Sequence, residues 1–121
     1  MGDNGSTFGR VLREKRVKKG FTLRRFAEMV GISPTYLSQV EQGKIGPPTS
    51  GRVMLMAELL GENPDEWIGL AGRMPDDIPG ILQSQPTALP ELLREVKGMT
   101  PEQLHRLKKQ AQKIMKKDQD K

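Results

Sequence analysis

The sequence contains no cysteine in its 121 residues, which excludes a disulfide framework and a thiolate metal site. Its one histidine, His105, cannot supply an ordinary set of metal ligands by itself, and we expect a solvated histidine beside Glu102. Glycine-rich phosphate loops and nucleophile motifs are also absent. We therefore expect no catalytic residues, no metal and no cofactor, and we do not expect an enzyme.

Aromatic residues make up 4% of the sequence and hydrophobic residues 35%, which is enough for a modest aliphatic core. The small share of aromatic and β-branched residues favours helices over a sheet. No apolar run approaches the roughly 18 residues of a membrane span. The first ten residues lack the basic and apolar blocks of a signal peptide. We therefore expect a cytoplasmic protein without a membrane partner.

Positive charge is concentrated near the N-terminus of this basic chain, whose formal net charge is +5. Residues 10–25 contain eight arginines and lysines but only one acidic residue, Glu14. Such a block indicates a polyanionic partner, and it is equally typical of a solvated helix face. A helical adaptor that binds an acidic protein or a membrane surface through this block is the alternative to nucleic-acid binding.

Helix start and stop signals divide residues 1–72 into a leader and five short helices. Residues 1–5 are expected to be a disordered leader, and Thr7 is expected to cap the first helix. The expected helices are residues 8–19, 23–30, 34–42, 50–60 and 64–71. Five helices with such short connections predict a compact all-α domain.

Composition changes after residue 72, where proline becomes frequent. The expected segments are a Pro-rich linker at 73–87 and a helical C-terminal segment at 88–121, with helices at 88–96 and 100–117. One short helical turn is expected in the linker, near Ile81 and Leu82. Thr100 and Gln103 have the spacing of a capping box, which predicts where the last helix begins.

Residues 23–42 have the pattern of two short helices that cross steeply around a tight turn. Close contact between the helices requires a small residue, which Ala27 supplies, and the turn requires positive φ, which Gly31 permits. The inner side of the angle must be apolar, and the required positions hold Phe26, Val30, Ile32, Leu37 and Val40. A generic helical hairpin is the alternative, but the adjacent basic block favours a helix-turn-helix that binds DNA.

This segment, within the run LREKRVKKGFTLRRFAEMVGISPTYLSQVEQGK, resembles the Cro/CI-like (XRE) family of helix-turn-helix regulators. The resemblance covers residues 8–71 and implies a five-helix, lambda-repressor-like DNA-binding domain. It further implies a bacterial or phage-type repressor that binds a palindromic operator as a dimer and associates with the nucleoid when bound. In this family the third helix enters the major groove and the start of the second helix contacts phosphate.

The resemblance assigns roles to individual residues of this sequence. Base contacts are expected from Ser33, Pro34, Thr35, Ser38 and Gln39, and phosphate contacts from Thr22, Arg24, Tyr36, Gln42, Lys44 and Arg52. Gln39 can pair through its amide with adenine, and Thr35 can donate a hydrogen bond or contact a thymine methyl group. Tyr36 is equally suited to packing inward. Arg16 and Glu41 are expected to form an ion pair between the first and third helices.

Two apolar surfaces are expected to pair copies of the chain into a homodimer or a higher oligomer. They comprise Trp67 and Leu70 in the fifth helix, and Leu104, Leu107 and Ile114 in the last helix. The alternative is that these residues close a small intramolecular core. The layout of the tail resembles that of short regulators with a C-terminal oligomerisation segment. It leaves two alternative functions open: an antitoxin that represses its own operon, and a repressor cleaved under stress by an ImmA-type metallopeptidase.

Overall fold

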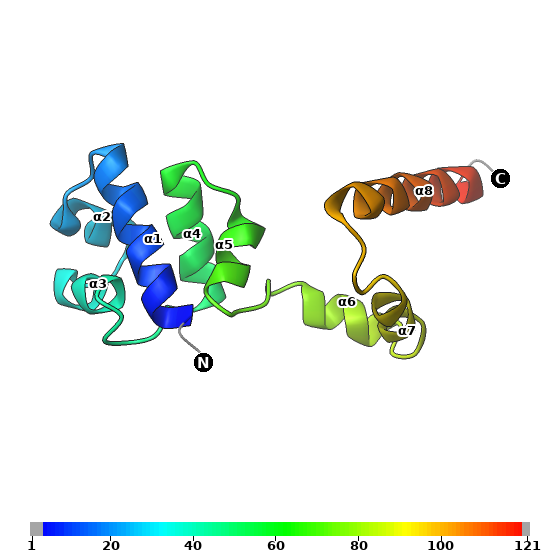
Figure 1. Ribbon diagram of the computed structural model, residues 1–121, viewed down its shortest axis with the longest axis horizontal. Coiled ribbons are helices and arrows are strands. Elements are labelled where there is room, and N and C mark those ends of the chain that lie inside the picture. Colours follow the sequence, from blue (N-terminus) through cyan, green and yellow to red (C-terminus); the bar gives the residue numbers. More distant parts are fainter. Residues whose placement is uncertain (1–3, 120–121) are drawn as a thin grey trace. The chain divides into compact units, whose positions relative to one another are not determined.

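The computed structural model describes residues 4–119, and every regular element in that range is a helix (Figure 1). The helices are α1 (Asn4–Lys19), α2 (Leu23–Val30), α3 (Pro34–Glu41), α4 (Ser50–Leu60), α5 (Pro64–Leu70), α6 (Ile78–Ser84), α7 (Ala88–Glu95) and α8 (Pro101–Gln119). They belong to two compact units, which divide between Ile78 and Pro79. The all-α fold class predicted from the sequence is confirmed.

Helices α2 and α3 begin at the capping residues that the sequence indicates. Thr22 Oγ1 accepts a hydrogen bond from the backbone N–H of Arg25 at 3.1 Å, and Ser33 Oγ accepts one from that of Tyr36 at 3.0 Å. Each cap satisfies a backbone donor that the first helical turn leaves free. Helix α2 ends at Gly31, whose φ of 79° lies in the left-handed region. The chain therefore turns sharply into α3, as the motif requires.

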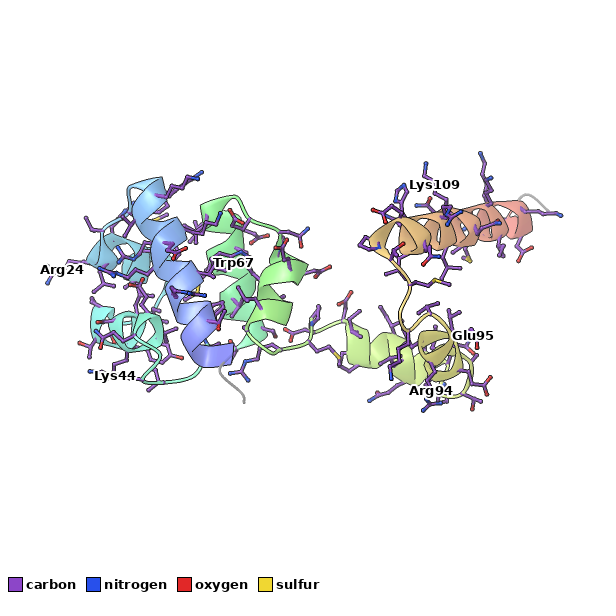
Figure 2. The ribbon with its side chains drawn as sticks, viewed as in Figure 1. Arg24, Lys44, Trp67, Arg94, Glu95 and Lys109 are labelled. Carbon is purple, nitrogen blue, oxygen red and sulfur yellow. The ribbon has the colours of Figure 1, made fainter. Side chains whose placement is uncertain are left out.

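The core of the first unit is mostly aliphatic and lies among α1 to α5, where α1 packs on α3, α4 and α5. Its buried side chains are Phe8, Leu12, Phe26, Ala27, Val30, Leu37, Val40, Val53, Met56, Ala57, Leu60, Trp67, Ile68 and Ala71. Phe8 and Trp67 meet edge to face with their ring centroids 5.8 Å apart. Figure 2 shows Trp67 inside this unit, and 2% of its surface is exposed.

The burial of Trp67 contradicts the expectation that it lies on a surface that pairs copies of the chain. A large aromatic side chain in a small domain contributes most to stability when it fills the core, and the Phe8 contact holds it there. Leu70 is half-buried against the same core. The fifth helix is thus mainly a packing element of its own unit.

The start of α1 also differs from the expectation. The helix begins at Asn4, so Thr7 is an internal helical residue and not the N-cap, and the part of the expected leader at residues 4–5 is helical. Residues 1–3 of that leader lie outside the described residues. Farther along α1, Gly9 lies against α3, where an added Cβ would come within 2.8 Å of the Glu41 carbonyl oxygen. The absence of a side chain at this position permits close contact between the two helices.

The segment expected to be a free linker is partly attached to the first unit. Arg73 donates hydrogen bonds to the backbone carbonyls of Pro47 and Pro48, and Ser50 Oγ bonds to the Asp76 carboxylate. Helix α6 is also longer than the single turn expected near Ile81 and Leu82. The first unit therefore extends beyond the boundary that composition indicated at residue 72.

The second unit contains amphipathic helices without a buried core. Within residues 79–119 no side chain is buried, and Leu104 and Ile114 are 43% and 60% exposed. The predicted capping box at the start of α8 is confirmed, because Thr100 N–H donates to Gln103 Oε1 at 2.9 Å and Gln103 N–H donates to Thr100 Oγ1 at 3.1 Å. Across the described residues, no helix is both long and apolar enough to cross a membrane.

Candidate nucleic-acid interface

Helix α3 presents an uncharged polar face to solvent. Its opposite side is anchored by Leu37 and Val40, which are fully buried. Thr35 and Gln39 are exposed and lie four residues apart, so they project from the same side of the helix. Ser33 and Pro34 are exposed at the N-terminal end of this face. The structure thus brings together four of the five residues expected to contact bases.

Ser38, the fifth expected base-contact residue, is half-buried and already has a partner. Gln42 Nε2 donates a hydrogen bond to Ser38 Oγ at 2.9 Å, one helical turn away. This bond leaves the Gln42 amide oxygen and the second amide hydrogen for a ligand. Ser38 and Gln42 therefore form one polar group at the end of α3.

Exposed cations flank the polar face of α3. Arg24 extends outward from the first turn of α2, and Lys44 follows the end of α3 (Figure 2). Thr22, the remaining expected phosphate-contact residue on α2, is exposed as the N-cap of that helix. Phosphates border the groove of a duplex on both sides, whereas base edges lie at its floor. Cations around an uncharged polar face match that arrangement.

A notch of about 470 Å³ opens between α1 and α3 beside the start of α2. Arg13 lines it together with Leu23 and Gln42. The sequence analysis gave Arg13 no separate role, because it is one of eight cations in the basic block and only the fold shows which of them lies near α3. Arg13 is accordingly a further cation beside the polar face.

The orientation of α3 is fixed by the ion pair between Arg16 and Glu41. Arg16 Nε donates to Glu41 Oε2 at 2.6 Å and Arg16 Nη2 donates to Glu41 Oε1 at 3.0 Å, so the pair is bidentate. Arg16 Nη1 also donates to the Phe21 carbonyl at 2.9 Å. Both charged residues are buried. The expected structural tie between the first and third helices is confirmed.

Arg52 and Tyr36 take positions that the phosphate-contact expectation did not describe. Arg52 Nη1 donates to the carbonyls of Val30 and Gly31, at 2.7 and 3.0 Å, and so caps the end of α2. The capping arginine lies 21 and 22 positions from the two carbonyls, so local sequence signals could not indicate this contact. Tyr36 is half-buried and packs against the core, so the inward of its two expected orientations is the one observed.

Comparisons with known proteins find a family model and solved structures that this chain resembles. A helix-turn-helix family model matches residues 12–67. One crystal structure of the clp gene regulator ClgR from Corynebacterium glutamicum is 28% identical, covers 81% of this chain and 95% of that chain, and has a TM-score of 0.50. A second ClgR structure from C. glutamicum is 32% identical, covers 57% of this chain and 88% of that chain, and has a TM-score of 0.48. The comparison with curated proteins finds no match.

The family model spans α2, α3 and α4 together with the second half of α1 and the first four residues of α5. It therefore covers the two helices of the motif, the uncharged face of α3 and the ion pair that fixes α3. The chain belongs to the Cro/CI-like (XRE) family of helix-turn-helix proteins and is a DNA-binding transcriptional regulator.

Proposed function

We propose that this regulator is a repressor that binds a palindromic operator as a dimer, with α3 in the major groove. The observation that carries the proposal is the exposed, uncharged face of α3, which is rigidly anchored by Arg16 and Glu41 and flanked by cations. A rigid helix with hydrogen-bonding side chains suits base reading, because each base edge in the major groove has its own pattern of donors and acceptors.

Gln39 and Thr35 are the principal base readers in this proposal. The Gln39 amide can donate to N7 and accept from N6 of adenine, and Thr35 can bond a base edge or contact a thymine methyl group. Arg24 and Lys44 contact phosphates and fix the register of the helix without reading sequence. Each well-formed base contact is worth about 1–3 kcal/mol of discrimination.

Pairing of two copies is assigned to the second unit. Leu104, Leu107 and Ile114 lie on α8 with no core of their own to join, and a dimer would bury them. Two DNA-binding units would then occupy half-sites roughly 34 Å apart on a symmetric operator. Leu107→Asp is expected to convert dimers to monomers in sedimentation equilibrium, whereas Gln112→Asp, a matched exposed change on α8, leaves the mass unchanged. An unchanged mass for Leu107→Asp would refute this pairing surface.

The base-reading proposal is tested by selecting DNA from a random duplex library with the full-length protein. We expect a palindromic sequence that is retained in competitor DNA at about 150 mM salt, where nonspecific polyanion binding collapses. Gln39→Ala should lose the preference for this sequence while keeping nonspecific affinity, and Gln112→Ala should bind as the unmodified protein does. Retained preference in Gln39→Ala would show that α3 is not the reading helix.

A further inference from the structure

The loop between α3 and α4 is held by a residue that follows α5. Arg73 Nε donates to the Pro48 carbonyl at 3.0 Å, and Arg73 Nη2 donates to the Pro47 carbonyl at 2.6 Å. One edge of the planar guanidinium therefore bridges two successive carbonyl groups. Pro47 and Pro48 have no backbone N–H and cannot join a backbone ladder, so this external donor fixes the path of the loop.

The position of Arg73 follows from how α5 ends. Gly72 has a φ of 72°, in the left-handed region, and the backbone N–H of Arg73 returns to the Ile68 carbonyl at 3.0 Å. This ending reverses the chain direction and brings residue 73 back to the start of α4. Arg73 therefore reaches the loop because of a defined helix ending and not because of a chance surface contact.

A second contact from the same segment acts on the same place. The N-cap of α4, Thr49, makes no side-chain capping bond. Ser50, the first residue of α4, instead bonds through its hydroxyl to the Asp76 carboxylate. A carboxylate near a helix N-terminus also interacts favourably with the helix dipole. Residues 73–76 thus complete the start of α4 from outside.

The loop that Arg73 holds begins where the proposed reading helix ends. The backbone N–H of Lys44 donates to the Gln39 carbonyl at 2.9 Å, so the loop leaves α3 at Lys44. At the other end, Arg52 in α4 bonds to the Val30 and Gly31 carbonyls in the turn before α3. Only a few residues of one short loop therefore separate Lys44, the proposed phosphate contact, from the carbonyls that Arg73 holds.

We propose that Arg73 is a positioning residue for DNA binding. It fixes the loop that carries Lys44, and so it raises DNA affinity without contacting DNA. This inference rests on the proposed function, because it uses the assignment of Lys44 to a phosphate. It makes residues 73–76 a segment through which changes in the C-terminal half of the chain alter DNA binding.

The test is a double-mutant cycle in the full-length protein. The probe is the duplex that the unmodified protein selects from the random library, and binding is followed by fluorescence anisotropy. Arg73→Gln and Lys44→Ala are each expected to weaken binding about tenfold, which corresponds to about 1.4 kcal/mol. The double variant should also bind about tenfold more weakly than the unmodified protein. Without the Lys44 side chain, the loop carries no phosphate contact that Arg73 could position. Arg94→Gln, the same change on α7, is the matched control and should bind normally.

Several outcomes would overturn the inference. Arg73→Gln would overturn it by binding within twofold of the unmodified protein. If adding Arg73→Gln to Lys44→Ala weakened binding by a further tenfold, Arg73 would contact DNA directly. A further decrease of about 0.9 in the slope of log affinity against log salt concentration would indicate the same. Arg73→Lys keeps the charge but cannot bridge two carbonyls in one plane, so it should bind at least about threefold more weakly, and normal binding would refute positioning.

Two controls separate this inference from its foundations. Urea unfolding followed by Trp67 fluorescence establishes that each variant is folded under the binding conditions, so a binding loss is not a loss of native protein. Failure of the unmodified protein to select any duplex would overturn the proposed function and this inference together. Normal selection combined with normal binding by Arg73→Gln would overturn the inference alone.

Discussion

Replacing Glu41 by glutamine removes one charge from the pair that joins α1 to α3. In the unmodified protein Arg16 makes two hydrogen bonds to the Glu41 carboxylate and a third to the Phe21 carbonyl. Glutamine keeps the shape of the side chain but offers one neutral acceptor. Arg16, which is 8% exposed, then keeps its guanidinium without a counter-charge.

The expected cost is large relative to the stability of the first unit. Breaking a buried ion pair by removing one partner typically costs about 3–5 kcal/mol. A unit of this size is expected to unfold with roughly 4–11 kcal/mol, from about 0.05–0.15 kcal/mol per residue. The substitution therefore removes about a quarter or more of the stability and should lower the melting temperature by about 12 °C or more.

Urea unfolding followed by the fluorescence of Trp67, the one tryptophan in the sequence, measures this cost directly. The matched control is the double replacement Arg16→Met and Glu41→Leu, which removes both charges and fills the same space. Replacing a buried pair by apolar residues of similar volume is often neutral, so most of the lost stability should return. A loss below about 1 kcal/mol in Glu41→Gln would be typical of an exposed pair and would refute the reasoning.

Three further predictions concern Gly9 in α1, Arg52 in α4 and the capping box of α8. Gly9→Ala should lose about 2 kcal/mol or more, because its Cβ would collide with the Val40 carbonyl and press on that of Glu41. Gly51→Ala in α4 is the matched control, because the added Cβ meets no atom within 4 Å beyond its own stretch of helix, and it should gain about 0.5–1 kcal/mol. Equal effects of the two substitutions would contradict the packing of α1 on α3. Arg52→Gln should lose about 1 kcal/mol of stability with an unchanged salt dependence of DNA binding, and a slope reduced by about 0.9 would restore Arg52 as a phosphate contact. Thr100→Ala should reduce the helical circular dichroism signal of the second unit through loss of about 1 kcal/mol at the capping box, and an unchanged signal would refute that role.

The parts of the fold that could be predicted from sequence are those set by neighbours along the chain. Thr22 and Ser33 cap the helices that follow them, and Gly31 ends α2 with positive φ. Each of these signals operates within four or five residues, so a single sequence contains all the information they need. The spacing of small and apolar residues in the motif is similarly local, which is why α2 was predicted with its observed bounds.

Features that depend on distant partners were predicted less well. Whether an amphipathic aromatic faces a partner chain or its own core depends on contacts such as that between Trp67 and Phe8, 59 positions earlier. The bonds of Arg52 to two backbone carbonyls 21 and 22 positions away could not be predicted from local signals, and its phosphate contact stays a prediction. The tie between Arg16 and Glu41 was predicted only because family resemblance supplied the long-range pairing.

The segment after Gly72 shows why composition alone does not locate the end of the first unit. Proline and glycine mark the chain after Gly72 as a linker, since they disfavour regular structure. Pro47 and Pro48, in the loop before α4, likewise lie outside regular structure, so their carbonyls have no partner in a helix or sheet. These two carbonyls accept hydrogen bonds from Arg73. A segment without regular structure is therefore bound to the loop that follows α3 by its side chains. If Arg73 positions this loop as proposed, a change at residues 73–76 would act on the loop that carries Lys44, and regulation through the C-terminal half would need no direct contact with DNA.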